Sequence, residues 1–231
     1  MLTRLVEELP RFLGYYNLVF LLKAALITLA LSAVGCSLGL MVGFFIAMVR
    51  VTRGKVLVPV RALCIAYVEF FRRIPFLVTL MVVFFVYQAL GRNTTVFTVA
   101  LTAVCLIATS YTAEIVRSGL ESVNVKQWEA AETMNLNLIQ TLWWVILPQA
   151  WKVILPPAFS FFILFIKDTA LASQIGVVEL TYAGKVLNNK GFGAVLVFGS
   201  VLLLYFIISY PLARFGARME KRLGVSKTGK R

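Results

Sequence analysis

Long uncharged runs are the feature that most constrains the fold of this chain. The longest lies between Lys23 and Arg50, where 26 consecutive residues carry no charge. A helix of about 20 apolar residues crosses the hydrocarbon core of a bilayer, so this run predicts a membrane span over residues 22–49. Of the 231 residues 60% are hydrophobic, and no long polar stretch remains to build a soluble domain. We therefore expect one all-α polytopic membrane domain over residues 1–231.

The same pattern predicts four further spans, at residues 75–90, 94–116, 152–175 and 194–213. The uncharged run of residues 74–91 is 18 residues long, and Pro75 near its start predicts a break or restart of the helix. The fourth span is irregular, because residues 153–166 give only 14 uncharged residues. It reaches a full crossing only if Lys167 and Asp168 lie in the protein interior.

Glycine recurs every four residues in the first span, at Gly35, Gly39 and Gly43. Small residues at this spacing let a second helix approach closely, so they predict a packing face. Before this span, the segment from Met1 to Asn17 mixes charged and apolar residues. It predicts an amphipathic helix on the membrane surface, with a flexible tail as the alternative.

The distribution of Lys and Arg predicts the orientation of the chain. Residues 50–73 carry six of them and residues 214–231 carry seven, whereas the loop after the second span carries one. Because cytoplasmic loops are rich in Lys and Arg, we expect the N-terminus outside and the C-terminus in the cytoplasm. The net charge of +13 otherwise suits contact with anionic lipid. The sequence has no basic face with interleaved aromatic residues, so it gives no indication of nucleic-acid binding.

A polar, helix-prone segment at residues 117–148, here called the docking segment, separates the third and fourth spans. It carries Glu129 and Glu132, and each unpaired charge in hydrocarbon costs roughly 2.5–3.5 kcal/mol. We therefore expect it outside the bilayer, and the distribution of Lys and Arg predicts the cytoplasmic side. Asn135 should end one short helix in the left-handed conformation, and a second short helix should follow over residues 138–146. A rival segmentation makes residues 133–151 a span and buries several polar side chains.

Catalytic and metal chemistry have few candidate residues. The chain has no histidine, and its cysteines Cys36, Cys64 and Cys105 lie in or beside apolar runs without metal-ligand spacing. We expect no metal site, no catalytic residue and no enzyme activity in this chain.

The docking segment resembles the EAA loop of ABC importer permeases, which reads Glu-Ala-Ala, three residues, Gly, nine residues, Ile-x-Leu-Pro. The spacing is kept, with Asn135 in place of the glycine and Val145 in place of the isoleucine. The resemblance implies that this segment couples the chain to a cytosolic ATPase. The implied coupling residues are Glu129, Ala130, Ala131, Asn135, Leu136 and Pro148.

Other stretches resemble the polar amino acid permeases of that family, of the histidine, glutamate, glutamine, arginine and opine type. Residues 67–77 resemble Tyr-x-Glu-x-Phe-Arg-Gly-Thr-Pro-Leu-Leu, with Arg73-Ile74 in place of Gly-Thr. Residues 111–119 resemble the stretch that precedes the loop, residues 167–171 resemble Lys-Asp-Thr-Ser-Leu, and residues 179–180 match its Glu-Leu. The likeness runs from about residue 62 to 180 in the order of the family.

The resemblance implies a five-span type I importer fold in the bacterial inner membrane, moving a polar amino acid by alternating access. It implies as partners two ATP-binding cassette subunits, a second permease copy or paralogue, and a substrate-binding protein. ATP and magnesium would lie in the ATPase subunit, since the sequence has no Gly-x-x-x-x-Gly-Lys-Ser/Thr motif. A secondary transporter or channel for a small polar solute is the alternative.

Two more groups of residues are candidates. Asp168 could attract a substrate ammonium group, with Thr169 and Ser160 as nearby hydrogen-bonding groups, of which Ser160 lies roughly on the same helix face. Alternatively, Lys167 and Asp168 only pair with neighbouring helices. Glu114 and Arg117, three residues apart, could form an interfacial ion pair.

Overall fold

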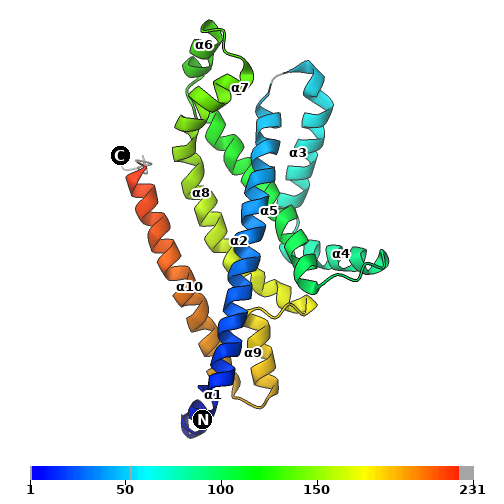
Figure 1. Cartoon of the computed structure of the whole chain (residues 1–231), viewed down its shortest axis with the longest axis vertical. Helices are drawn as coiled ribbons and strands as arrows, with labels where there is room; N and C mark the ends of the chain where they lie inside the picture. Colours follow the sequence, from blue (N-terminus) through cyan, green and yellow to red (C-terminus); the bar gives the residue numbers. More distant parts are fainter. Residues whose placement is uncertain (1, 53, 224–231) are drawn as a thin grey trace. The chain divides into compact units, whose positions relative to one another are not determined.

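The computed structural model describes residues 2–52 and 54–223, and every regular element in these ranges is helical (Figure 1). The predicted all-α membrane fold is therefore confirmed. The α-helices are α1 (Leu2–Phe12), α2 (Tyr15–Val51), α3 (Val58–Arg73), α4 (Phe76–Ala89), α5 (Val96–Glu121), α6 (Val125–Thr133), α7 (Leu138–Gln140), α8 (Leu147–Asp168), α9 (Leu180–Asn189) and α10 (Ala194–Arg222). Short 3₁₀ helices are η1 (Lys55–Leu57) and η3 (Thr169–Ile175), and η2 (Thr141–Ile146) is a π-helix.

Four helical stretches of the described chain are long and apolar enough to cross a membrane. They are α2, α5, the stretch Leu138–Ile175 and α10. Helices α3 and α4 qualify only together, as one broken span, which gives up to five. The break follows the prediction at Pro75: Ile74 and Pro75 both have extended backbone torsions, with ψ of 134° and 139°.

The helical path continues where the sequence predicted an end. The second short helix begins at Leu138 as expected, but it runs through η2 into α8 instead of ending at Ile146. Pro148 cannot donate a helical hydrogen bond to the carbonyl four residues before it. The backbone widens there into a π-helix, with Leu147 N–H donating to Leu142 O, rather than stopping.

The chain forms two compact units. The first comprises the described parts of residues 1–36, 75–105 and 162–212, and the second those of residues 37–74, 106–161 and 213–231. In the first unit the ends of α1 and α2 pack with α9 and α10 around Phe12, Leu21, Leu187 and Val197. The helix predicted near the N-terminus is present as α1. Its Glu8 carboxylate accepts a 2.6 Å hydrogen bond from Gly193 N–H.

The glycine face of α2 packs directly against α5. A Cβ added at Gly39 would lie 2.5 Å from Ala108 Cβ, and one at Gly43 would lie 2.3 Å from Thr112 Oγ1, both within the second unit. The Thr112 hydroxyl also donates to Gly39 O at 2.8 Å. Within the first unit, Gly35 approaches Val104 in the same way. The predicted packing face is confirmed.

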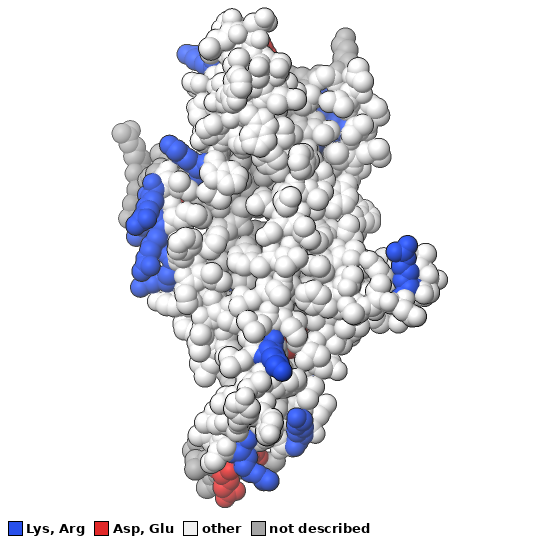
Figure 2. Space-filling view, viewed as in Figure 1, with Lys and Arg blue, Asp and Glu red and all other residues white. Residues whose placement is uncertain are grey.

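Lys and Arg side chains gather over the C-terminal end of α10 (Figure 2). Arg214, Arg218, Lys221 and Arg222 follow a helical spacing that places them on one side of the helix, and all four are exposed. They form the described part of the predicted basic tail, whose residues 224–231 lie outside the described ranges.

Candidate functional site

Between the end of α5 and the start of α8, the docking segment folds as α6, α7 and η2, green in Figure 1. Asn124 begins α6, because its side chain accepts a 3.0 Å hydrogen bond from Lys126 N–H. Of the Glu-Ala-Ala residues, Glu129 and Ala130 are exposed, while Ala131 is buried. The Glu129 side chain therefore points outward, and the buried Ala131 packs α6 against the rest of the unit.

Asn135 ends this helix as predicted. Its φ of 54° is the only positive φ among the described non-glycine residues. Asn135 N–H donates to Glu132 O at 2.9 Å, and Leu136 N–H donates to Ala131 O at 3.1 Å. This pair of bonds is the Schellman motif, in which a left-handed residue satisfies the last helical carbonyls.

A reciprocal cap begins the next helix, and the sequence reasoning above missed it. The Asn137 side chain accepts from Gln140 N–H, and the Gln140 side chain accepts from Asn137 N–H, both at 2.9 Å. The signal was present as Asn-x-x-Gln, a variant of the capping box. The four residues between α6 and α7 are thus fixed from both sides, which makes the turn rigid.

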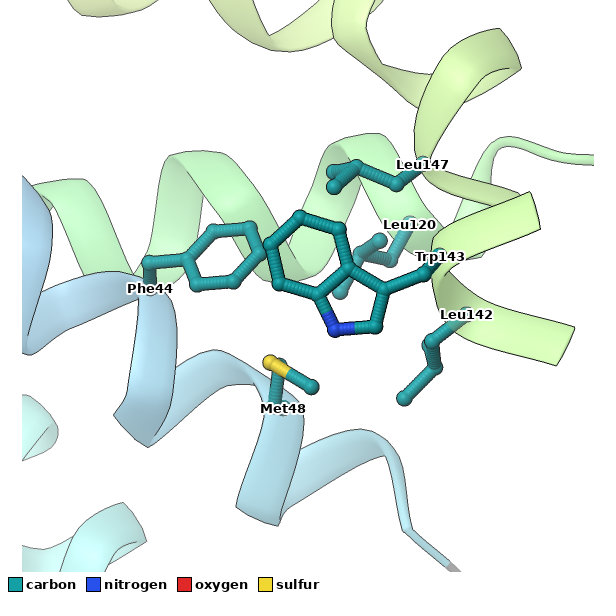
Figure 3. A pocket seen from close by; sticks show the side chains of 6 residues that line it. All are labelled: Phe44, Met48, Leu120, Leu142, Trp143 and Leu147. Carbon is teal, nitrogen blue, oxygen red and sulfur yellow. The ribbon is translucent and has the colours of Figure 1, made fainter. Parts of the chain in front are cut away.

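The docking segment is anchored to α2 and α5 by a buried apolar cluster. Its members are Ala47, Val116, Leu120, Leu142, Ile146, Ala150 and Ile154, all in the second unit. Beside it, Trp143 of η2 and Phe44 of α2 help to line a small apolar pocket (Figure 3). None of the six lining side chains carries a charge, so this pocket offers no ion-pairing group to a polar amino acid.

The outer surface of the segment suits a protein partner. Met134 and Ile139 are 72% and 65% exposed, close in sequence to the acids Glu129 and Glu132. Leu136 is half-buried and Pro148 is exposed. A rigid projection that mixes apolar and acidic side chains can dock on another protein, and the described residues contain no group of His, Cys, Asp or Glu that could hold a metal ion.

Glu114 and Arg117 lie together on α5. The Glu114 carboxylate accepts hydrogen bonds from the Arg117 guanidinium on both of its oxygens. Arg50 of α2 also donates to it, at 2.7 Å, and Arg117 pairs in addition with Glu121. The sequence spacing pointed to the contact between Glu114 and Arg117 but not to Arg50, which is 64 residues away from Glu114.

The predicted pathway residues have different environments. Asp168, the last residue of α8, is half-buried, and Lys167 and Ser160 are exposed. Thr169 is buried and donates its hydroxyl to Ile166 O at 2.7 Å. Their role in substrate passage stays a prediction.

Glu179 is a buried acid whose place the sequence did not reveal. It caps α9, where one carboxylate oxygen accepts from Tyr182 N–H at 2.8 Å and the other from Thr181 N–H and the Tyr205 hydroxyl. Burial raises the pKa of this carboxyl, and the hydrogen bonds from Thr181, Tyr205 and Tyr182 oppose the rise. The Glu179 carboxylate thus joins two N–H groups of α9 to a hydroxyl of α10, which makes it a structural anchor of the first unit.

Known proteins resemble this chain in sequence and architecture. Residues 39–223 match the family of the binding-protein-dependent transport system inner membrane component. The chain is 32% identical to the probable glutamine ABC transporter permease protein GlnP of Bacillus subtilis (strain 168) over 91% of this chain and 98% of that protein. It is 33% identical to the L-cystine transport system permease protein TcyB of the same organism, over 85% and 83%. A solved amino acid ABC transporter with histidines superposes with a TM-score of 0.80 at 26% identity, over 91% of this chain and 99% of that one.

Proposed function

The chain belongs to the family of binding-protein-dependent transport system inner membrane components, and from this we propose that it passes a polar amino acid into the cytoplasm. It is the membrane permease subunit of an ABC importer, in which ATP hydrolysis belongs to a separate subunit. Relatives named for glutamine and cystine support an amino acid or close relative as the substrate. The observation that carries the proposal is the docking segment, a rigid exposed projection anchored on two long apolar helices.

The proposed mechanism is alternating access driven from the cytoplasm. Two ATPase subunits each receive one docking segment, one from this chain and one from a second permease copy or paralogue. A substrate-binding protein delivers the amino acid, and ATP and magnesium bind in the ATPase subunits. When the ATPase dimer closes, it moves the docking segments, and the buried contacts of Leu142 and Ile146 transmit the movement to α2 and α5.

The proposal includes the location of the chain. A bacterial inner membrane suits a permease family with several apolar helices. We place the C-terminus and the docking segment in the cytoplasm and the N-terminus outside, because Lys and Arg concentrate in residues 50–73 and 214–231.

Glu129→Lys tests the coupling role. The permease is reconstituted in proteoliposomes with the ATPase and binding protein of its own transport system, and uptake of radiolabelled glutamine and cystine is measured. Reversing an exposed charge on a docking surface weakens the contact, so we expect uptake to fall about tenfold while the affinity of the binding protein for its amino acid stays the same. Glu7→Lys makes the same change of charge on an exposed residue of α1 and serves as the control.

Three results would contradict the proposal. Unchanged uptake in Glu129→Lys would remove the coupling role of this residue. Uptake by the unaltered protein without ATP, driven by an ion gradient, would favour the secondary transporter. Absence of any ATPase subunit bound to the purified chain would argue against an ABC importer altogether.

The substrate pathway is a second part of the proposal. Asp168 is half-buried at the end of α8, where a fixed carboxylate could attract an ammonium group in a medium of low dielectric constant. We expect Asp168→Asn to accumulate normally, to lose transport, and to lose the stimulation of ATP hydrolysis by loaded binding protein. A variant that fails to accumulate, with normal turnover in the fraction that remains, would make Asp168 structural.

A further inference from the structure

A cluster of charges on the second unit joins three helices through one carboxylate. Glu114 of α5 has Arg50 Nη1 of α2 at 2.7 Å and Arg72 Nη1 of α3 at 3.7 Å, both from the same oxygen. Arg117, one turn along α5, binds the carboxylate through two of its nitrogens and also pairs with Glu121. We call Arg50, Arg72, Glu114, Arg117 and Glu121 the Glu114 cluster.

The burial of Arg50 and Glu114 distinguishes their contact from a surface ion pair. The side chains of Arg50 and Glu114 are only 9% and 20% exposed. Arg50 Nε is buried without a hydrogen-bond partner. The Glu114 carboxylate is therefore the group that compensates the charge of this arginine. Removing one partner of a buried ion pair leaves the other charge uncompensated, which is far more costly than losing an exposed pair.

Helix α3 is held to α5 mainly by polar contacts. Val68 is its only buried residue among those described. The Tyr67 hydroxyl donates to Leu106 O at 2.7 Å, and the Tyr111 hydroxyl donates to Arg72 O at 3.4 Å. The Arg72 guanidinium lies over the Tyr111 ring, 5.7 Å from its centre. With Val68 as its one fully buried described residue, α3 also depends for its position on these polar contacts and on the salt bridge between Arg72 and Glu114.

The cluster lies next to the anchor of the docking segment. Val116 and Leu120 follow Glu114 on α5, and Ala47 precedes Arg50 on α2; all three belong to the apolar core that holds η2. A force on the docking segment therefore reaches α2 and α5 close to the Glu114 cluster. Among the described residues, the salt bridge that links α3 to both helices lies in this cluster.

We propose that Glu114 is a positioning residue that fastens α3 to α2 and α5, so that the three helices follow the docking segment as one body. This inference rests on the proposed function and extends it, because it names the group that carries the movement to α3. Without the fastening, the ATPase still turns over but α3 no longer moves with its neighbours. ATP hydrolysis is then uncoupled from transport.

Arg72→Gln tests the proposal with a matched control beside it. Arg72 is partly exposed and faces Glu114, whereas the adjacent Arg73 pairs at 2.6 Å with Glu69, where the two side chains are 77% and 44% exposed. Each variant removes one positive charge from the same end of α3. We expect Arg72→Gln to lower the amount of amino acid transported per ATP hydrolysed about tenfold, and Arg73→Gln to change it less than twofold.

A distance measurement separates positioning from a loss of activity. Spin labels on the exposed residues Leu63 of α3 and Val125 of α6 report the distance within the second unit, after Cys36, Cys64 and Cys105 are replaced by alanine. Arg72→Gln and Glu114→Gln should broaden the distance distribution, and Arg73→Gln should not. This readout needs no transport, so it tests the fastening even if the proposed substrate is wrong.

Glu114→Gln adds a double-substitution cycle. Alone, it leaves the buried Arg50 charge without compensation, and we expect the largest loss of coupling. Combined with Arg50→Met, which removes that charge, the amount of folded protein should partly return but the coupling should not, because Arg72 still lacks its carboxylate partner; adding Arg73→Met should restore neither. If the labels show the same narrow distribution in Arg72→Gln as in Arg73→Gln, or if the two variants couple equally, the proposal is wrong.

Discussion

Asn135 shows how one residue shapes the docking segment. Its φ of 54° would be reached by glycine without strain, whereas a β-branched residue would pay about 1–2 kcal/mol in the left-handed region. We expect Asn135→Gly to leave the turn intact and Asn135→Val to open it. Hydrogen exchange of the Leu136 amide, which donates to Ala131 O, measures this directly and should quicken roughly tenfold in the valine variant.

The two variants also act as controls for each other, since both remove the amide side chain. An equal loss of protection of the Leu136 amide in both variants would mean that the side chain of Asn135, not its backbone conformation, holds the turn. Slower uptake in Asn135→Val alone would link the rigidity of the turn to coupling.

Glu179 makes stability depend on pH. Burial raises the pKa of this carboxyl in the folded protein. A carboxyl with a raised folded-state pKa stabilises the fold fully at a pH below its unfolded pKa, which is about 4.3. This stabilisation is lost as the pH rises through the folded-state pKa. We therefore expect the stability of the unaltered protein to fall relative to that of Glu179→Gln as the pH rises across this window. Thermal unfolding in detergent at several pH values measures the difference.

Glu220→Gln, which changes the same kind of group in α10, is the control for Glu179→Gln. It should follow the pH profile of the unaltered protein. A stability difference between the unaltered protein and Glu179→Gln that grows with pH would show that the hydrogen bonds to the carboxylate outweigh its burial.

The contact between α2 and α5 depends on the absence of side chains. At Gly39, an added Cβ would lie 2.5 Å from Ala108 Cβ and 2.9 Å from the backbone N of Thr109, so the helices must separate to admit it. At Gly199 of α10, an added Cβ meets nothing within 4 Å. We expect Gly39→Ala to lower the free energy of unfolding by about 1–3 kcal/mol and Gly199→Ala to change it little.

Unfolding in detergent and the amount of protein in the membrane both report this difference. If Gly39→Ala were as stable as Gly199→Ala, the close approach of α2 and α5 would not contribute to folding. If Gly199→Ala alone were defective, the open side of α10 would be the important packing face.

The topology of the whole chain is tested by reporters. A reporter fused after Arg231 should behave as cytoplasmic, and one inserted at Asn188-Asn189 in the last turn of α9 should behave as external, because the density of Lys and Arg differs between the two sides. Alkaline phosphatase and a fluorescent protein at each site give opposite signals. The same side for both sites would contradict the five-span arrangement.

The sequence by itself determined the features that depend on neighbouring residues. Uncharged runs predicted apolar helices, the glycine spacing predicted the packing face of α2, Pro75 predicted the break before α4, and Asn135 predicted the end of α6. In each case the cause is local, because periodicity and backbone torsions act within a few residues. The continuation of the helix through η2 was missed, since apolar contacts with α2 and α5 keep that turn folded despite Pro148.

Only the tertiary structure decided which distant side chains meet. Arg50 and Glu114 are 64 residues apart, and Glu179 and Tyr205 are 26 apart, yet each pair is joined by a 2.7 Å hydrogen bond. Such contacts depend on how helices turn about their axes when their apolar faces pack, and no local pattern encodes that rotation. The sequence showed Glu114 beside Arg117, but the packing of α2 and α3 against α5 made it the carboxylate shared by three arginines.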